Sequence, residues 1–314
     1  MGAGNRKRRK DAPKRLSHGR PPVFQKQQKT LSSKTTKTLI NRHHVLEKKR
    51  KQAVLKKDQK EVDIIESELA SLGGIEAYQR ASLQGQRNDR GGDSSKLLME
   101  WLRPAVDTLK RSPLRLLEVG ALSTDNACSK SLCFGMERID LNSQGEGILQ
   151  QDFMARPLPR DDSERFDIIS LSLVLNFVPN AKDRGKMLWR TLAFLRQPDR
   201  ISPKQLGDFF PSLFLVLPAP CITNSRYTDE QQLGRIMTSL GYTKTQHKST
   251  NKLIYYLWRR VPISLNSNIF LGRKTEIRSG ASRNNFSILL DAAWPSWPVT
   301  ASAAALPTQH FTDT

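Results

Sequence analysis

Residues 116–131 read "LLEVGALSTDNACSKS", and their pattern is the clearest indication of the fold. Leucine and valine fill its beginning, and small polar residues follow directly after Gly120. This pattern is typical of a buried strand that ends in a tight turn. A glycine there lets the backbone change direction sharply and lets a ligand approach the main chain. Taken alone, the stretch is either a ligand-binding turn or the plain end of a strand.

Apolar segments alternate with helical patterns from residue 114 onward. The expected strands are 114–120, 136–142, 147–154, 166–179, 212–220, 252–260 and 284–291, and the expected helices are 181–196 and 229–242. This alternation predicts an α/β fold with a mostly parallel, doubly wound sheet. We expect the two late strands, 252–260 and 284–291, to form an antiparallel hairpin at one edge of the sheet.

The 314 residues divide into four segments by composition. We expect a disordered basic N-terminal arm over 1–40, a helical N-terminal extension over 41–110, the α/β domain over 111–291 and an unstructured tail over 292–314.

Within the extension, apolar residues at helical spacing predict one long helix over 41–72, which ends before the glycine pair 73–74. A further helix is expected to begin after a capping residue, either Asp93 or Ser94.

The net charge of +21 lies mostly at one end of the chain. Residues 1–60 contain 20 Lys and Arg against three acidic residues, which gives +17, and the other 254 residues give +4. Dense basic clusters serve as nuclear addresses and neutralise nucleic-acid phosphates. We therefore expect a location in the nucleus and nucleolus and a nucleic-acid partner. A solvated tail that only keeps the protein soluble is the alternative.

Three cysteines, Cys128, Cys133 and Cys221, are too few and too irregularly spaced for a disulfide framework or a metal site. We expect reduced thiols and no metal. The chain has no run of about 18 apolar residues, so no membrane partner is expected.

Acidic residues end the second and third predicted strands. Ligands of open parallel sheets bind at the carboxyl ends of the strands. Asp140 stands twenty residues after Gly120, a spacing that suits a carboxylate bound to a ribose diol. Asp152 and Phe153 supply an acid and an aromatic ring for an adenine. Each residue taken singly is also compatible with an ordinary turn.

The turn lacks the further glycines that a pyrophosphate requires, which argues against a dinucleotide. Glu118 precedes Gly120 in the E-x-G form that is common in methyltransferases. Together these residues predict a pocket for S-adenosylmethionine, a cofactor without phosphate.

The fourth strand and the loop after the fifth carry candidates for substrate binding. Ser172 lies within the apolar run "SLSLVLNFVP" and Asn176 ends its apolar part, and both are candidates to hold a nucleobase. In "TNSRY", Asn224, Arg226 and Tyr227 are candidates to hold and stack the base. Asn176 and Asn224 are also weak candidates for a catalytic role. The alternatives are a buried strand with a polar exit and a loop that packs against the fifth strand.

Ordered segments along the chain carry a family resemblance: "AYQRASLQGQRNDRGGDSSKLLMEWL", "LLEVGALSTDNA", "RIDLNS", "QQDFM", "SLVLNFVP", "PAPCITNSRY" and "RNNFSILLD". These segments resemble those of the fungal 25S (large-subunit) rRNA adenine-N1 methyltransferases. The resemblance covers about residues 70–291. It implies a class I methyltransferase (Rossmann-like) fold, S-adenosylmethionine as cofactor, and methylation of an adenine N1 in 25S rRNA.

The resemblance also implies a nucleolar enzyme whose partner is rRNA in the precursor of the large ribosomal subunit. The family's two cofactor positions fall on Gly120 and Asp140. Residues 196–210 and the tail after residue 291 depart from the family pattern. Animal relatives resemble an S-adenosylmethionine sensor, which the same pocket would serve, and a silent assembly factor is a third reading. The basic arm favours the rRNA enzyme, because a sensor has no need to neutralise phosphates.

Overall fold

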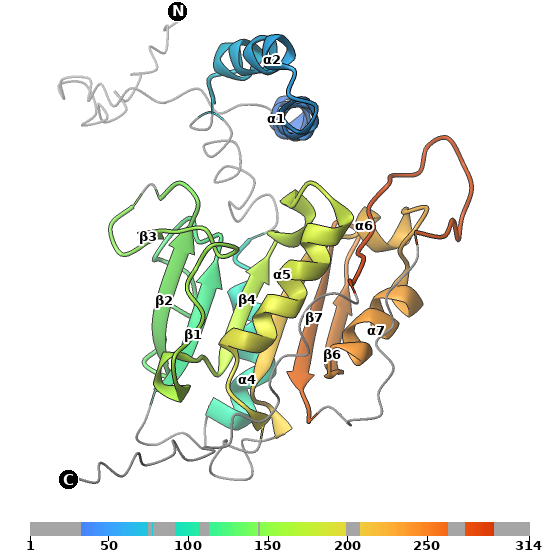
Figure 1. Cartoon of the computed structure of the whole chain (residues 1–314). Coiled ribbons are helices and arrows are strands. Elements are labelled where there is room, and N and C mark those ends of the chain that lie inside the picture. The colour runs from blue at the N-terminus through green and yellow to red at the C-terminus, as the bar shows by residue number, and fades with distance from the viewer. Residues whose placement is uncertain are drawn as a thin grey trace, which may run out of the picture.

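The computed structural model describes residues 33–74, 77, 92–106, 113–143, 145–198, 208–262 and 274–291. Its centre is a seven-stranded sheet (Figure 1). The strands are β1 (Leu114–Val119), β2 (Phe134–Asp140), β3 (Leu149–Gln150), β4 (Ile168–Ser172), β5 (Ser212–Pro218), β6 (Tyr242–Ser249) and β7 (Leu253–Arg260). Their order is β3-β2-β1-β4-β5-β7-β6. The first five strands pair in parallel, and β7 pairs antiparallel with both β5 and β6. This topology confirms the predicted Rossmann-like class.

Helices cover both faces of the sheet, with α4 (Ser95–Val106) behind it and α5 (Ala181–Phe194) and α7 (Glu230–Ser239) in front (Figure 1). Successive residues of β1 point to opposite faces, as the period of a strand requires. Leu117 and Val119 join the core cluster that includes α5 and α7, and Leu114 and Leu116 join the cluster that includes α4. Both faces are apolar, so the central strands read as continuous hydrophobic runs.

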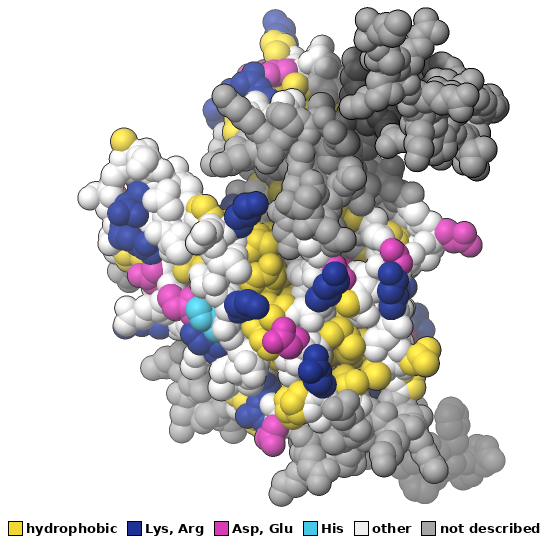
Figure 2. All heavy atoms as spheres, turned by 180° about the vertical axis from the view of Figure 1, so that it is seen from behind, with side chains coloured by type: hydrophobic (Ala, Val, Ile, Leu, Met, Phe, Trp, Pro, Cys, Tyr) yellow, Lys and Arg dark blue, Asp and Glu magenta, His cyan; other side chains and the backbone are white. Residues whose placement is uncertain are grey.

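Three short helices complete the description: α6 (Pro220–Thr223), η1 (Asp162–Glu164) and η2 (Leu175–Phe177). Seen from behind, basic and acidic side chains of the described residues are interspersed with apolar ones (Figure 2). On the part of that face which the described residues form, charges of both signs are mixed with apolar side chains.

The predicted edge hairpin exists but uses a different strand. β6 and β7 form it, whereas residues 284–291 make only an isolated bridge, from Asn284 to Ser225. Apart from Tyr242, the side chains of β6 are exposed, so no apolar pattern marks this strand in the sequence. Residues 274–291 instead lie as a strap across the α5 N-terminus, where the Leu289 N–H donates to the Ala181 carbonyl at 2.9 Å.

The predicted single helix over 41–72 is wrong in two respects. It begins earlier, as α1 (Ser33–Leu55), so the last part of the expected arm is helical. It also breaks before α2 (Gln59–Ser71), because Lys57 adopts a φ of 58° and Asp58 caps the new helix by accepting from the Glu61 N–H. The two helices pack through a small apolar cluster (Leu46, Ala53, Val62, Ile65 and Leu69). Residues 1–32 and 292–314 lie outside the described residues.

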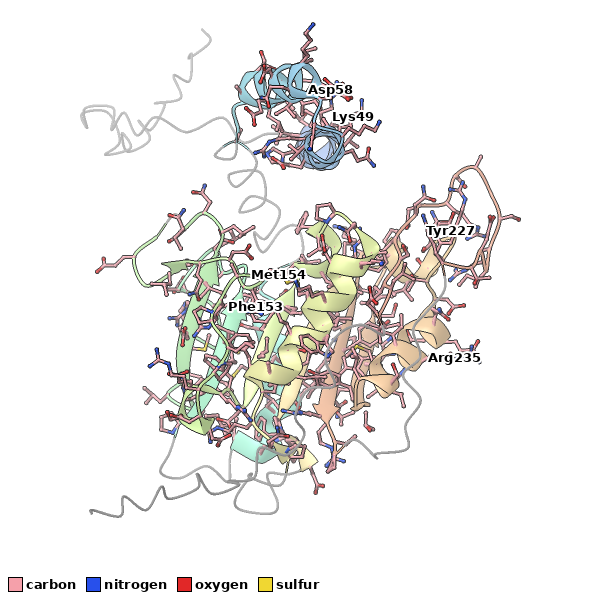
Figure 3. The ribbon with its side chains drawn as sticks, viewed as in Figure 1. Lys49, Asp58, Phe153, Met154, Tyr227 and Arg235 are labelled. Atoms are coloured by element: carbon pink, nitrogen blue, oxygen red, sulfur yellow. The ribbon has the colours of Figure 1, made fainter. Side chains whose placement is uncertain are left out.

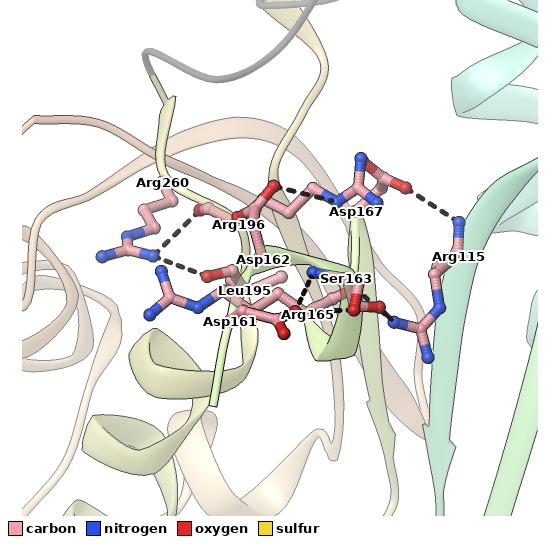
Figure 4. A network of polar contacts seen from close by, with 9 residues as sticks. All are labelled: Arg115, Asp161, Asp162, Ser163, Arg165, Asp167, Leu195, Arg196 and Arg260. Atoms are coloured by element: carbon pink, nitrogen blue, oxygen red, sulfur yellow. Dashed lines mark hydrogen bonds and ion pairs between the residues drawn. The ribbon is translucent and has the colours of Figure 1, made fainter. Parts of the chain in front are cut away.

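The amino ends of the parallel strands are joined by a charged network (Figure 4). Asp167, which is 3% exposed, accepts from the Arg115 N–H at 2.8 Å and lies 3.6 Å from the Arg196 guanidinium. Arg260, at the end of β7, donates to the carbonyls of Leu195 and Arg196. The network ties β1, β4, β7 and the end of α5 together at this edge.

The three cysteines are free thiols, as predicted, and burial raises the pKa of Cys128 to about 12. Among the described residues, no three His, Cys, Asp or Glu side chains are grouped to hold a metal ion. None of the described helices is both long and apolar enough to cross a membrane.

Candidate functional site

The strand order reverses between β1 and β4, because β2 and β3 lie on one side of β1 and β4 and β5 on the other. Such a switch point opens a crevice at the carboxyl ends of the strands. Gly120 follows β1 there with a φ of 75°, and its N–H donates to the Ile139 carbonyl at 2.8 Å. A Cβ atom on Gly120 would lie 2.6 Å from the Val174 side chain, just after β4. Only glycine fits this turn without displacing its neighbours.

Glu118 shapes the loop after the turn from inside. Its two carboxylate oxygens accept from the Asn126 side-chain amide at 3.0 and 2.9 Å. Burial raises the pKa of the Glu118 carboxyl; the Asn126 hydrogen bond and Arg138 oppose the rise, and the charge of Asp93 adds to it. Glu118 therefore organises the loop that faces the crevice, as well as being a predicted cofactor residue.

Asp93 bonds both to the start of α4 and to the loop after β1, and the second contact was not predicted from the sequence. One carboxylate oxygen accepts from the Ser95 N–H and hydroxyl at the start of α4, in the capping role expected of it. The other accepts from the Ala127 N–H at 2.7 Å, across 34 residues of chain. Beside it, the Ser94 and Ser172 hydroxyls lie 2.8 Å apart. The 92–95 segment thus links α4 to the ends of β1 and β4.

Asp140 is the last residue of β2, and the parallel register that pairs Val119 with Ile139 places it beside Gly120. One carboxylate oxygen accepts from the Asn142 N–H at 2.9 Å. A carboxylate offers about four acceptor positions, which is enough to bind a ribose diol as well as the backbone. The structure thus brings Gly120, Glu118 and Asp140 to one edge, as the spacing predicted.

The third-strand pair behaves differently. Asp152 is exposed, and its carboxylate accepts from the Met154 N–H at 2.7 Å, which fixes the turn that follows β3. Phe153 is only 2% exposed and packs 5.3 Å from the Phe194 ring of α5, measured between centroids. Figure 3 shows Phe153 and Met154 in the loop after β3. Phe153 is therefore a core residue, and almost none of its ring is open for the predicted stacking on an adenine.

Asn176 lies in η2, directly after β4, on the switch-point side of the sheet. Its side-chain oxygen is buried and has no hydrogen-bond partner among the described residues. Buried polar atoms are almost always bonded, so an unpartnered one requires an explanation. Val174 and Asn176 belong to the same short segment, which places this acceptor close to the Gly120 turn.

Two predicted substrate residues are engaged by the strap, which the sequence could not show because the partners are distant. The Asn224 amide nitrogen donates to the Ser282 carbonyl at 3.2 Å. The Arg226 guanidinium donates to the Asn285 side chain at 2.6 Å. The alternative of a packed loop is therefore correct in part, although the loop packs against the strap.

Tyr227 occupies the same loop, at the outer end of α6 (Figure 3). The Lys274 ammonium lies 4.6 Å from the centre of its ring, within the range of a cation–π contact. One face of the ring is thus covered by a positive charge rather than open for a base.

The hydrogen-bond acceptors at the crevice fit S-adenosylmethionine. Asp93, Glu118 and Asp140 are acidic, a composition that repels polyphosphates and suits a ligand with a positive charge and ribose hydroxyls. Asn176 adds an unpartnered acceptor on the neighbouring strand.

Comparisons with known proteins show the family to which the chain belongs. The model of a family described as "25S rRNA (adenine(2142)-N(1))-methyltransferase, Bmt2" matches residues 63–288. The "25S rRNA adenine-N(1) methyltransferase" of Schizosaccharomyces pombe is 40% identical over 259 residues, which cover 81% of this chain and 91% of that protein.

The "25S rRNA (adenine(2142)-N(1))-methyltransferase" of Saccharomyces cerevisiae is 39% identical over 227 residues. That match covers 72% of this chain and 63% of the yeast protein, less than two thirds of its length. Among solved structures, an rRNA methylase from Escherichia coli matches with 13% identity and a TM-score of 0.37, over 74% of this chain and 93% of that one. The family model and both fungal relatives cover the crevice residues from Asp93 to Asn176, and the chain belongs to the family of 25S rRNA adenine-N1 methyltransferases.

Proposed function

We propose that this protein transfers a methyl group from S-adenosylmethionine to N1 of an adenine in 25S rRNA, at the position equivalent to the adenine 2142 of the family description. The observation that carries the proposal is the family match over residues 63–288, which spans both the crevice and the loop after β5. The acidic side chains of the crevice suit S-adenosylmethionine, which carries no phosphate.

Bound S-adenosylmethionine supplies an electrophilic methyl group on a cationic sulfur. Asp140 accepts hydrogen bonds from the ribose hydroxyls at the end of β2. Gly120, which has no room for a Cβ atom beside Val174, would let the cofactor approach the backbone after β1. Glu118 holds the loop 120–128 in place through Asn126.

Asn176 orients the target base. An adenine presents its 6-amino group beside N1, and the buried Asn176 oxygen is an acceptor without a partner. A hydrogen bond from the amino group to this oxygen aims the N1 lone pair toward the methyl donor. N1 carries no proton at neutral pH, so no general base is required, and catalysis is mainly positioning. The base must leave its helix or occupy a single strand to enter the crevice.

The location and the assembly context are part of the same proposal. The charge of +17 over residues 1–60 supports entry into the nucleolus and contact with rRNA in the precursor of the large subunit. Fluorescence microscopy of the tagged full chain, with and without residues 1–32, tests the location.

The direct test is a methyl-transfer assay with tritium-labelled S-adenosylmethionine and 25S rRNA from a strain that lacks this gene. We expect label at an adenine N1 with the wild-type protein and none with Gly120→Arg. Gly234→Ala is the matched control, because a Cβ atom at Gly234 meets no atom within 4 Å. Tight cofactor binding without transfer, on naked rRNA and on pre-ribosomes alike, would contradict the proposal.

A further inference from the structure

Five side chains gather at the outer end of β5 and α6, and we call them the basic platform: Arg226, Tyr227, Lys274, Arg278 and Arg283. Arg226 and Tyr227 come from the loop after α6, and the other three come from the strap. The bridge between Ser225 and Asn284 holds loop and strap together. In Figure 1 the strap is the outermost loop above α6, at the edge where β1, β2 and β4 end.

The arginines of the basic platform are held by carbonyl oxygens. Arg278 donates to the carbonyls of Thr223 at 2.7 Å and Ile222 at 2.8 Å, and Arg226 donates to the Gly280 carbonyl at 2.9 Å. A carbonyl fixes the position of a guanidinium but does not cancel its charge. The loop and the strap therefore present cations in fixed positions.

The charges of the basic platform are not compensated by nearby acids. Among the ion pairs of the described residues, none involves Arg226, Lys274, Arg278 or Arg283. By contrast, Lys182 of α5 does form an ion pair with the strap, since its ammonium lies 3.2 Å from the Asp291 carboxylate. Glu276 is the one acidic residue between positions 274 and 286. This fixed positive charge indicates an anionic ligand that comes from outside the chain.

A short chain of contacts joins the basic platform to the target-base position. Arg184 of α5 donates to the carbonyl of Pro179, three residues after Asn176, and to the carbonyl of Ser287 in the strap. The neighbouring Phe286 carbonyl accepts from the Ser225 hydroxyl at 2.6 Å. The segment that presents Asn176 and the segment that presents the cations are thus parts of one hydrogen-bonded unit.

We propose that the basic platform binds backbone phosphates of the rRNA strand next to the target adenine. This inference rests on the proposed function, and it names the part of the rRNA that the basic platform contacts. Arginine forks match phosphate oxygens, and an exposed lysine adds a point charge. When an adenine is held at Asn176, the RNA chain on either side of it lies close to loop 223–228, where these cations lie. Arg226 and Tyr227 then position the backbone and do not read the base edge.

The test measures binding of the full chain to unmethylated 25S rRNA transcript as a function of salt, for wild type and for Lys274→Gln with Arg283→Gln. The slope of log K against log salt is negative, and each lost phosphate contact makes it shallower by about 0.7–0.9. We therefore expect the slope of the double variant to be shallower by about 1.5. Its binding should be about tenfold weaker at low salt. The KM for rRNA should rise with little change in kcat. Cofactor affinity should not change.

Two further variants separate charge from misfolding. Glu276→Gln removes the acid of the strap and should tighten rRNA binding about threefold, an effect that damage to the fold does not produce. Arg103→Gln is the matched control, because Arg103 is an exposed cation in the last turn of α4, at the other end of the domain.

Each outcome decides between distinct readings. An unchanged salt slope in the double variant, with wild-type protein that binds and methylates rRNA, would overturn the basic platform and leave the enzyme standing. Wild-type protein that neither binds nor methylates rRNA would overturn the proposed function itself. A polyglutamate peptide that binds as tightly as the transcript, and loses affinity in the double variant, would assign the surface to an acidic protein and overturn the RNA proposal.

Discussion

The two ends of the parallel strands are both rich in polar groups, but they treat charge in opposite ways. At the amino edge, cations meet carboxylates of the same chain: Arg196 meets Asp167 and Arg115 meets Glu137. At the carboxyl edge, the arginines of the basic platform donate to carbonyl and side-chain amide oxygens, and Lys274 lies over the Tyr227 ring. The Asn176 oxygen has no hydrogen-bond partner among the described residues. Unpartnered nitrogens do occur among the arginines of the amino edge, such as Arg196, but that guanidinium lies beside Asp162 and Asp167. The paired charges of the amino edge serve the fold, whereas the unpartnered acceptor at the carboxyl edge supports a ligand there.

The largest effect is expected at the amino edge. Asp167→Ala removes a buried carboxylate from two partners and should lower the free energy of unfolding by about 3 kcal/mol. Cofactor affinity of the protein that remains folded should not change. Chemical denaturation and calorimetry measure the two quantities. A loss of cofactor affinity without loss of stability would break the contrast between the edges.

At the carboxyl edge, Asp140→Ala should do the reverse. We expect S-adenosylmethionine to bind more weakly by about 1.5–3 kcal/mol, the usual size for hydrogen bonds to a charged acceptor. Isothermal titration calorimetry measures the change. Asp161→Ala is the control, because that exposed carboxylate caps η1 at the amino edge. Equal affinities for the Asp140 and Asp161 variants would remove Asp140 from the site.

Two asparagines that lie four residues apart in the sequence, Asn176 and Asn180, are expected to differ in the same way. Asn176→Ala leaves no bonded partner behind, so stability should hold while kcat/KM for rRNA falls about 10–100-fold, or about 1.4–2.7 kcal/mol. Asn180→Ala removes the cap of α5, where the side chain accepts from the Asp183 N–H, and should cost about 1 kcal/mol of stability. Methyl transfer per folded molecule should be kept. The same loss of stability in both variants would show that Asn176 serves the fold.

The smallest effect concerns pH. Because burial raises the pKa of Glu118 in the folded protein, its ionisation destabilises the fold as pH rises from the unfolded value, about 4.3, through the folded one. Wild type should therefore lose stability relative to Glu118→Gln between pH 4.5 and pH 7. Thermal unfolding at both pH values, with Glu146→Gln as a surface control, measures the change. A difference that stays constant with pH would contradict it.

The sequence predicted the fold where one strand face or one helix stripe carried the signal. β1, β4, β5 and β7 are apolar runs, and their order along the chain was enough for the class of fold. β6 escaped notice because its side chains are polar on both faces. Residues 284–291 were predicted as a strand because the apolar residues Phe286, Ile288 and Leu290 stand at every second position, and all three are buried. Their backbone, however, makes no ladder with the sheet and bonds elsewhere.

The site was predictable to the extent that it follows strand ends. The placement of Gly120, Glu118 and Asp140 at one edge followed from the sequence, and their cofactor role stays a prediction. The link from Asp93 to Ala127 and the engagement of Arg226 by Asn285 join positions 34 and 59 residues apart, and no local pattern reports such contacts. Phe153 was misread because an aromatic residue at a strand end looks the same whether it faces a ligand or the core.

The strap also orders events in time. A ribosome makes the chain from its N-terminus, and domains begin to fold as they emerge. The residues of the cofactor crevice, from Asp93 to Asn176, emerge more than 90 residues before Arg278 and Arg283. The cofactor side can therefore assemble on a nascent chain that still lacks Lys274, Arg278 and Arg283, three of the four cations of the basic platform. Completion of the substrate side is one of the last steps of synthesis, so a chain that stops early would hold the methyl donor without a firm grip on the RNA.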